Sequence, residues 1–593
     1  MADGPGAPVA RVIPDVAGID REFDYLVPAS LAGEVGKGSV VRVPLHGRKV
    51  RGWVSEFPVV SQPGLDLLPL ERLAAKGPTP DLVDLAGWAA WRWAGRRRSL
   101  LVTASAPTLV KALEPPSRRT PARPAGGRTT SGGAAETVLR GAGPGTRLVR
   151  VGPATPMTQL VLAAAERGPA LVIAPTRQRA ESGSSALRRQ GMSVALLPEE
   201  WARARSGVDV VIGARGAAWG PCADVASIVV LDAHDEGLVQ EQAPTWDAPT
   251  VAAQRARLLQ LPCFWVSACP TLELVHAADE VVAAGPSAER EGWAPLLVAD
   301  RRGEDPRLGL YSEMLVQAAR REAKRVVCVL NRKGRAVLVD CRACGELATC
   351  EACGAALTMA GDRLVCPRCH LARPLVCGSC ASDALRLARP GVSRAREELE
   401  ALTGKPAAEL TSGRDPLPDG PVLVGTEAVL YRDAELARGG GVGLVAFLDF
   451  DQELLAPRYR AGEEALALLA RASRLVGGRR KGGRVLVQTR LPGHPVVAAA
   501  QRAEPGWLNA SEEPVRKALR FPPFSALALL SGPGSSELAG ALSALVPSTL
   551  EVEPLADQRW VVRAGDHTEL ADALALAGRP SERVRVEVGP VRF

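Results

Sequence analysis

Eight cysteines fall into four Cys-x-x-Cys pairs between residues 341 and 380. They are Cys341 and Cys344, Cys350 and Cys353, Cys366 and Cys369, and Cys377 and Cys380. Each pair can aim two thiolates at one metal ion, and two pairs complete the tetrahedral four-sulfur shell that zinc prefers. The eight ligands therefore predict two structural zinc ions in one small module.

The spacing between the pairs favours one of the three ways of joining them. The longer segment between Cys353 and Cys366 suits a strand-turn-strand ribbon, whereas the shorter one between Cys344 and Cys350 leaves little room for one. We therefore expect a nested arrangement. One ion would be bound by Cys341, Cys344, Cys377 and Cys380, and the other by Cys350, Cys353, Cys366 and Cys369.

Other uses of these cysteines stay open from sequence alone. An iron–sulfur cluster is also held by four thiolates, and free thiols or a redox relay would need no metal. Complete four-sulfur shells leave no position for water, which disfavours a catalytic metal. His370 follows Cys369 directly and is a further ligand candidate, but eight cysteines already saturate two ions. The remaining cysteines lie in or beside apolar runs and are expected in the core: Cys222, Cys263, Cys269 and Cys328.

A phosphate-binding loop is expected after the apolar run at 147–151, but its chemistry is missing. A phosphate loop needs backbone N–H groups that turn toward the phosphates and a lysine that neutralises them. The segment from Gly152 to Thr158 contains two prolines, which lack amide donors, and Met157 stands where the lysine would be. The sequence contains no Gly-Lys followed by Ser or Thr. We therefore expect a degenerate nucleotide site at Gly152, Met157 and Thr158.

The carboxylate half of such a site is also incomplete. An ATPase needs one acid that holds Mg²⁺ and a group that activates water. The apolar run at 228–231 is followed by Asp232, Ala233 and His234, so Asp232 can still contact a metal but no glutamate stands beside it. Asp235 and Glu236 are weaker substitutes. Two independent losses in one site favour an inactive remnant.

Bulk composition narrows the class of protein. The chain has 593 residues, 46% of them hydrophobic and 23% charged, which fits a soluble multidomain protein. The formal net charge of +8 is compatible with a nucleic-acid partner and equally with a solvated surface. The N-terminus lacks the features of a signal peptide, and no stretch is long and apolar enough to span a membrane. Clustered Cys-x-x-Cys pairs fit a reducing cytoplasm.

The pattern along the chain divides it into regions of different type. Residues 8–60 alternate short β-type runs with turns, and residues 80–94 have helical spacing with tryptophans that we expect in the core. Residues 113–137 are rich in proline and glycine, as in a linker. Short apolar runs separated by helix-length segments then predict two α/β lobes around parallel sheets, with the cysteine module inside the second. The last ninety or so residues indicate a small α+β unit.

Together these motifs resemble the primosomal replication restart protein (PriA) family over nearly the whole chain. The segments that carry the resemblance are Phe23 to Pro28, Arg42 to Pro44, Gly52 to Val54, Leu330 to Gly334, the eight cysteines, Gly425 and Thr426, Leu448 to Asp451, and Phe521 to Phe524. The resemblance implies a multidomain α/β fold. Its expected parts are a β-rich 3′-DNA-end-binding domain at 1–110, a linker at 111–138, degenerate RecA-like helicase lobes at 139–303 and 304–505, a zinc-binding insertion at 339–383, and an α+β domain at 506–593.

The resemblance also locates the motifs that have changed. The family's Gly-Lys-Thr loop corresponds to Gly152 through Thr158, and its Asp-Glu-x-His box to the segment from Asp232 to His234. The Ser-Ala-Thr-Pro motif survives as residues 267–270, with Cys269 in place of threonine. The last helicase motif keeps both arginines, Arg471 and Arg474, but loses both glycines. The family's winged-helix segment has no evident equivalent.

The resemblance further implies DNA-contacting residues. Phe23, Asp24 and Tyr25 would lie near the pocket that receives a nascent 3′ end, although Phe23 and Tyr25 fit equally well as core residues of a strand. Arg471 and Arg474 would contact DNA phosphate, and solvation at the surface is the alternative.

We expect a protein that recognises branched DNA at abandoned replication forks and promotes reloading of the replicative helicase without hydrolysing ATP. Its cofactors would be two zinc ions, with ATP doubtful, and its partners replication restart primosome proteins and the replicative helicase machinery. We expect no membrane partner, a monomer and a cytoplasmic location. The alternatives are an active 3′-to-5′ DNA helicase with a remodelled nucleotide site and a zinc-containing nucleic-acid adaptor that is not specific for forks.

Overall fold

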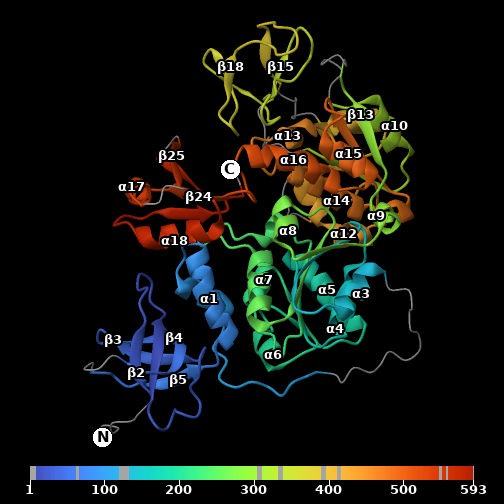
Figure 1. The fold of residues 1–593 in the computed structure, drawn as a ribbon. Coiled ribbons are helices and arrows are strands. Elements are labelled where there is room, and N and C mark those ends of the chain that lie inside the picture. Colours follow the sequence, from blue (N-terminus) through green and yellow to red (C-terminus); the bar gives the residue numbers. More distant parts are fainter. Residues whose placement is uncertain are drawn as a thin grey trace.

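The computed structural model describes residues 8–61, 66–118, 133–302, 310–330, 338–388, 395–410, 416–545, 550–555, 558–591 and 593, and the statements below concern these residues. Figure 1 shows the N-terminal unit and the cysteine module at opposite ends of the molecule, with two α/β lobes between them and the C-terminal unit to one side. No helix in the described ranges is long and apolar enough to cross a membrane.

The N-terminal unit is a five-stranded antiparallel sheet with the strand order β2-β1-β4-β3-β5. Its strands are β1 (Val9–Pro14), β2 (Phe23–Leu26), β3 (Val40–Leu45), β4 (Arg48–Val59) and β5 (Arg72–Ala75). Alternate residues of β3, such as Val41 and Val43, are fully buried, because successive side chains of a strand point to opposite faces. The β-rich start of the chain thus folds as its alternation predicts.

Two helices connect this sheet to the first lobe: α1 (Pro80–Arg92) and α2 (Arg97–Ala104). Helix α1 begins with Pro80, whose fixed φ suits the first helical position. Leu82, Leu85 and Ala89 recur at helical spacing and are fully buried. At the far end, the indole N–H of Trp201 donates to the Ala104 carbonyl over 3.0 Å. The helices therefore bind the N-terminal sheet to the first lobe.

The first lobe contains a seven-stranded parallel sheet with the order β12-β6-β11-β10-β7-β9-β8. Its strands are β6 (Gly145–Arg150), β7 (Ala170–Ile173), β8 (Val194–Leu196), β9 (Val210–Gly213), β10 (Ser227–Leu231), β11 (Pro262–Ser267) and β12 (Glu280–Ala283). The helical segments are α3 (Ala134–Gly141), α4 (Met157–Ala165), α5 (Arg177–Arg189), α6 (Trp201–Ser206), η1 (Arg215–Trp219), η2 (Glu236–Leu238), α7 (Ala248–Leu259), α8 (Leu272–Ala277) and α9 (Pro286–Gly292). Two hydrophobic clusters cover the two faces of this sheet, which is why its strands are uninterrupted apolar runs.

The second lobe contains a six-stranded parallel sheet with the order β13-β23-β22-β14-β21-β20. Its strands are β13 (Leu296–Asp300), β14 (Arg325–Val329), β20 (Ala407–Leu410), β21 (Val422–Gly425), β22 (Val442–Phe447) and β23 (Arg484–Thr489). The helical segments are α10 (Glu313–Arg321), α11 (Ala395–Thr403), η5 (Glu427–Tyr431), α12 (Asp433–Arg438), α13 (Asp451–Leu454), α14 (Ala461–Leu475), η6 (Arg479–Lys481), α15 (Pro495–Arg502) and α16 (Gly506–Ala518). Helix α14 is buried along most of its length.

Small sheets complete the fold. The cysteine module is built from β15 (Leu338–Cys341) with β19 (Leu385–Ala388), and from β16 (Thr358–Ala360), β17 (Arg363–Val365) and β18 (Ala372–Pro374). The C-terminal unit is an antiparallel sheet with helices α17 (Ser535–Ser543) and α18 (His567–Ala577). Its strands are β24 (Ala526–Ser531), β25 (Glu551–Leu555), β26 (Arg559–Ala564) and β27 (Arg585–Val588).

Two expected boundaries differ from the elements. Helix α3 begins at Ala134, inside the range 111–138 expected as linker, and residues 119–132 of that range lie outside the described residues. Strand β13 lies inside the range expected for the first lobe but pairs with β23 of the second sheet. A single apolar run does not reveal which of two sheets it joins. Of the segment Leu330 to Gly334, only Leu330 is described.

Candidate functional site

The structure brings the eight cysteines together as two groups of four. One group is Cys341, Cys344, Cys377 and Cys380, the other is Cys350, Cys353, Cys366 and Cys369, and within each group the sulfur atoms all lie within 4.8 Å of one another. In the first group Sγ–Sγ distances of 3.6 Å join Cys341 to Cys380 and Cys344 to Cys377. A tetrahedron with Zn–S bonds of about 2.3 Å has edges of about 3.8 Å. Both groups therefore fit a zinc ion with four thiolate ligands.

Four equivalent turns shape these sites. In each, the residue after the second cysteine has a positive φ and donates its N–H to the carbonyl of the first cysteine. Glycine occupies this position twice, at Gly345 and Gly354, where left-handed backbone costs it little. His370 and Ala381 occupy it in the other two turns. His370 is exposed and serves as a turn residue, since four sulfur atoms already surround the adjacent site.

Backbone N–H groups around the sulfur atoms favour the thiolate form. The Cys369 N–H donates to the Cys366 sulfur over 3.5 Å, and the Ser379 N–H donates to the Cys377 sulfur over 3.4 Å. A hydrogen bond from the Cys344 backbone lowers the pKa of Cys341 to about 7. Because the thiolate is the form that binds metal, these donors prepare the site for a cation.

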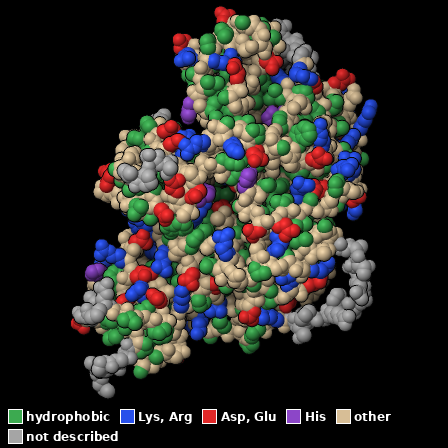
Figure 2. Space-filling view, viewed as in Figure 1, with side chains coloured by type: hydrophobic (Ala, Val, Ile, Leu, Met, Phe, Trp, Pro, Cys, Tyr) green, Lys and Arg blue, Asp and Glu red, His purple; other side chains and the backbone are tan. Residues whose placement is uncertain are grey.

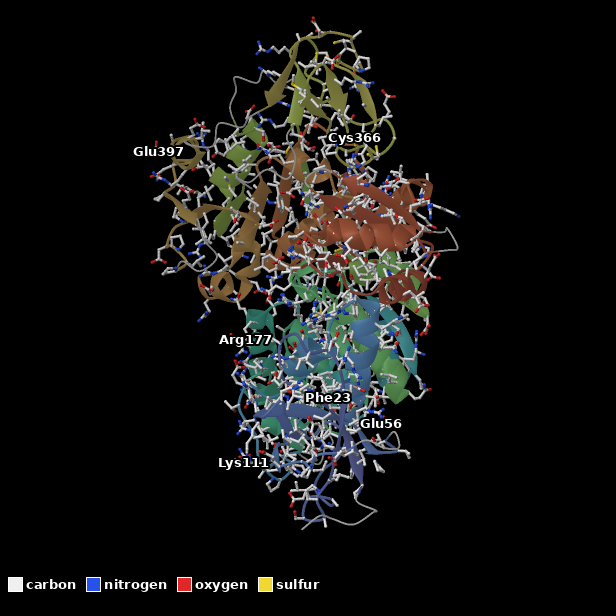
Figure 3. All side chains as sticks on the ribbon, turned by 90° about the vertical axis from the view of Figure 1, so that its left-hand side faces the viewer. Phe23, Glu56, Lys111, Arg177, Cys366 and Glu397 are labelled. Atoms are coloured by element: carbon white, nitrogen blue, oxygen red, sulfur yellow. The ribbon has the colours of Figure 1, made fainter. Side chains whose placement is uncertain are left out.

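Arg368 fixes the cysteine module to the second lobe. Its guanidinium donates to the Cys353 carbonyl over 2.9 Å and to the Ala456 carbonyl, next to α13, over 2.8 Å. A backbone hydrogen bond from Ala356 to Leu455 adds a second attachment. In Figure 3 the labelled Cys366 lies in the module, far from the labelled Phe23 in the N-terminal sheet. The metal sites are thus remote from the N-terminal unit.

The loop after β6, predicted as a degenerate phosphate loop, packs against another segment of the protein. Gly152 and Gly292 stand back to back, and a Cβ added to Gly152 would lie 2.8 Å from the Gly292 Cα. The Ala154 N–H donates to the Gly292 carbonyl over 3.2 Å. Helix α4 begins at Met157, which packs partly buried against the core together with neighbouring residues of the lobe, and Thr158 follows it within the helix. The backbone N–H of Ala154 in this loop therefore points at another segment of the protein.

Two arginines of α14 reach across to the carboxylates of the first lobe. The Arg474 guanidinium contacts both oxygens of Asp232, one of them over 2.8 Å, and donates to the Pro153 carbonyl over 2.8 Å. Arg471 lies 2.9 Å from Asp235 and stacks on Tyr431 at 4.5 Å. These contacts pair the side chains of Asp232 and Asp235 with arginines of the second lobe.

Charges from α5 and α12 extend this cluster. Arg179 lies 3.6 Å from Asp232 and 2.9 Å from Asp433. Burial alone would raise the pKa of Asp232, but Arg474 and Arg179 outweigh it and lower that pKa well below its usual range. We name Arg179, Asp232, Asp235, Asp433, Arg471 and Arg474 the interlobe charge cluster. The cavity beside it measures about 20 Å³, which is room for about one water molecule.

His234 is held in its neutral form beside the cluster. Its Nδ1 lies 2.8 Å from the Ser267 hydroxyl, so the surviving residues of two motifs contact each other. Burial lowers the pKa of His234 to about 4. The side chain therefore joins the cluster to β11 without adding a charge at neutral pH.

The residues expected near a DNA 3′ end are largely structural here. The Tyr25 side chain is 4% exposed, and its hydroxyl donates to the Pro44 carbonyl over 3.0 Å. Asp24 pairs with Arg11 over 2.9 Å, and Phe23 packs partly buried on the same core. Their contact with DNA stays a prediction. Arg471 and Arg474 point into the interlobe charge cluster, so their contact with DNA phosphate also stays a prediction.

The sequence reading missed a basic hairpin in the N-terminal unit. His46 and Gly47 form the turn between β3 and β4, both with positive φ, and Arg48, Lys49 and Arg51 after them are exposed. Basic residues beside a turn glycine between two strands were the available signal. The partners of Asp232 were harder to find, because Arg179 and Arg474 are distant in sequence and no local pattern joins them.

Comparisons with known proteins find relatives for much of the chain. Residues 11–105 match the 3′DNA-binding domain (3′BD) of PriA. The probable replication restart protein PriA of Mycobacterium tuberculosis is 29% identical, over 90% of this chain and 87% of that protein. The replication restart proteins PriA of Synechocystis and Bacillus subtilis are each 27% identical, over 63% and 58% of this chain. The chain spans about half the length of these two relatives, 50% and 46%.

Two solved structures resemble this chain distantly. Dbp5 of Saccharomyces cerevisiae bound to RNA and ADP BeF3 is 11% identical with a TM-score of 0.34, over 65% of this chain and 93% of that one. A DEAD box protein from Methanococcus jannaschii is 11% identical with a TM-score of 0.30, over 61% and 86%. The chain is thus similar to replication restart proteins PriA over much of its length, and residues 11–105 match the 3′DNA-binding domain of PriA.

Proposed function

We propose that this protein binds branched DNA at abandoned replication forks and supports reloading of the replicative helicase without hydrolysing ATP. The proposed absence of ATP hydrolysis rests on the Arg474–Asp232 pair. This pair occupies the interlobe site where a nucleotide and its magnesium would bind. The lysine that would neutralise phosphate is replaced by Met157. The cavity lined by Arg179 and Arg474 measures about 20 Å³, which is far below the range of about 300–1,000 Å³ typical of ligand pockets.

The expected partner is DNA, and the basic β3–β4 hairpin supports this expectation. Arg48 is exposed at the hairpin tip, and no carboxylate of the described residues pairs with it. Lys49 is largely exposed but lies 2.9 Å from Glu71. Phosphate contacts of this kind position a protein on nucleic acid without reading its sequence. The hairpin belongs to the matched 3′DNA-binding domain, so we assign it to the DNA backbone.

Two zinc ions would hold the cysteine module in shape. The two four-sulfur groups suit zinc in ligand type and spacing, and complete sulfur shells assign the ions a structural role. Each zinc would be bound by thiolates alone. Metal binding would then supply stability to a module that is too small for a substantial core of its own. We further propose that the protein acts as a monomer in the cytoplasm with the other restart proteins.

One experiment separates the inactive protein from an active helicase. Steady-state ATP hydrolysis is measured with forked DNA at saturation, and in parallel the binding of a fluorescent ATP analogue is measured by anisotropy. We expect tight fork binding, no hydrolysis above the DNA-free background and no nucleotide binding at millimolar magnesium. Fork-stimulated hydrolysis, or saturable nucleotide binding, would contradict the proposal and favour an active helicase.

A second comparison tests the preference for branched DNA. The affinities for forked, duplex and single-stranded probes of equal length are compared at one salt concentration, because phosphate binding alone is insensitive to branching. We expect the fork to bind most tightly. Equal affinities for all three probes would instead identify a nucleic-acid adaptor that is not specific for forks.

A further inference from the structure

A cavity of about 430 Å³ lies where four parts of the molecule meet, and we name it the junction cavity. Its walls come from the end of α1, from the first lobe, from α14 of the second lobe and from the C-terminal unit. In Figure 2 this side of the surface is hollowed between the C-terminal unit and the two lobes. Its volume is within the range of about 300–1,000 Å³ that binds small molecules. It borders the interlobe charge cluster, because Asp235 and Arg471 line both this cavity and the small one.

Part of the junction cavity is apolar. Trp93 and Trp265 line it and are each only 2% exposed. The Trp265 indole N–H already donates to the Pro249 carbonyl over 3.1 Å, so this ring offers the cavity an apolar surface. Leu468 and Pro523 extend the same kind of surface from the second lobe and the C-terminal unit. An aromatic or aliphatic body can be buried against these side chains.

Arg92 is a lining cation without a hydrogen-bonded acid. Its Nη1 is buried and has no hydrogen-bond partner among the described residues. Burial lowers the pKa of Arg92 to about 10, and the more distant Asp247 only partly offsets this. The Asp247 carboxylate itself accepts from the Thr250 N–H over 2.8 Å. Arg92 is partly buried, and leaving its buried Nη1 without a partner is costly, which is a reason to look for an anion that completes it.

His567 presents a second unsatisfied group to the same space. Its Nδ1 is buried without a hydrogen-bond partner, and the residue lines the cavity at the start of α18. Burial, and then the charge of Arg92, lower the pKa of His567 to about 3, so the ring is neutral at physiological pH. Helix α18 is anchored to α1 by a 2.8 Å hydrogen bond from the Trp91 indole to Asp572. The two helices thereby present Arg92 and His567 to one cavity.

The other lining cations are already paired. Arg460 lies 3.0 Å from Glu273, and Arg471 lies 2.9 Å from Asp235. The carboxylates that line the cavity disfavour a ligand with several negative charges, and a DNA backbone for the same reason. They are those of Asp235, Glu236, Asp247, Glu273, Glu427, Glu463 and Glu464. An anion is therefore favoured only beside Arg92 and His567, and it must be small and carry a single charge.

We propose that the junction cavity binds a small organic carboxylate, with its carboxylate between the Arg92 guanidinium and the His567 imidazole and its apolar body against Trp93 and Trp265. The guanidinium donates two parallel hydrogen bonds to a carboxylate, and the neutral imidazole donates a third from Nδ1. Because four parts of the molecule form the walls, an occupied cavity stabilises their arrangement.

The probe is 4-fluorobenzoate, added to the full-length protein and observed by fluorine NMR. We expect saturable broadening of its signal and a rise in the thermal midpoint of the protein. The neutral 4-fluorobenzamide, which has the same shape, should bind at least about tenfold more weakly, because a hydrogen bond to a charged group is lost. Absence of saturable broadening at millimolar probe, or equal binding of the amide, would overturn the proposal.

Variants locate the site. Arg92→Met keeps most of the bulk of the side chain and removes a partly buried charge, so the fold should persist while the probe affinity falls at least about tenfold. Arg189→Met, an exposed position on α5, is the matched control and should bind as the unmodified protein does. His567→Phe provides a second variant, for which we expect several-fold weaker binding. Unchanged affinity in both cavity variants would show that the probe binds elsewhere and overturn the proposal.

Discussion

Arg474 of α14 and Asp232 at the end of β10 form a two-pronged ion pair that joins the two α/β lobes. The Asp232 side chain is 1% exposed and that of Arg474 is 17% exposed, so the pair is largely shielded from water. The same guanidinium also donates to the Pro153 carbonyl. Arg474 thus connects the loop after β6, through Pro153, with Asp232 at the end of β10.

Removing one partner of this pair should destabilise the protein. Arg474→Met leaves Asp232 buried with only Arg179 nearby, and breaking a buried pair costs about 3–5 kcal/mol. We expect the apparent thermal midpoint to fall by several degrees, measured by differential scanning calorimetry. Adding Asp232→Asn should recover part of the loss, because the uncompensated charge is gone. The exposed control Arg189→Met should leave the midpoint unchanged, and an equal midpoint for Arg474→Met would show that the pair contributes little.

Restoring the missing lysine should not restore nucleotide binding. Met157→Lys supplies the positive charge, but Gly152 remains packed against Gly292 and Arg474 still occupies Asp232. We expect no saturable binding of a fluorescent ATP analogue by anisotropy and no hydrolysis with forked DNA. Nucleotide binding by this single variant would mean that the lysine alone limits the site and that the packed loop opens readily.

The cysteine module should contain two zinc ions. Plasma emission spectrometry of the purified protein should give about two zinc atoms per chain, and Cys366→Ser should reduce this to about one, because the two sulfur groups do not share ligands. Cys222→Ser, at a buried cysteine outside the module, is the control and should retain both ions. Iron with absorption near 400 nm would instead identify an iron–sulfur cluster.

Stability should fall as the pH is lowered from about 6.5 to about 4. Burial lowers the pKa of His234 and of His494 to about 4 in the folded protein, whereas the unfolded chain binds these protons near pH 6.5. The unfolded state therefore binds more protons in this window, so the free energy of unfolding rises with pH. His234→Asn should flatten the dependence of the thermal midpoint on pH. An unchanged slope in this variant would show that His234 is protonated alike in both states.

The β3–β4 hairpin should contribute to DNA affinity through charge. Arg48→Glu should weaken binding to forked DNA several-fold and reduce the slope of log affinity against log salt by about one, as expected for the loss of one phosphate contact. Fluorescence anisotropy over a salt series measures both quantities. The variant Arg189→Glu carries the same charge change outside the 3′DNA-binding domain. Equal losses in the two variants would point to net charge and not to the hairpin.

Local patterns in the sequence were sufficient for the elements and the metal ligands. Alternation gave the strands of the N-terminal sheet, and uninterrupted apolar runs gave β7, β10 and β22, because these periods report burial directly. The Cys-x-x-Cys pairs and the lengths between them were enough to predict both four-sulfur groups. The absence of a Gly-Lys-Ser or Gly-Lys-Thr sequence could also be read directly, since a phosphate loop is a contiguous motif.

Only the tertiary structure decided which side chains pair with Asp232. Arg179, Asp232 and Arg474 come from segments far apart in the chain, and the choice of partner for a buried charge depends on which side chains the folded lobes bring within a few ångströms. The same holds for β13, whose apolar run is compatible with either sheet until its neighbours are known. Short-range spacing determines strands, helices and metal-binding turns. Long-range packing determines which charged side chains pair between the two lobes.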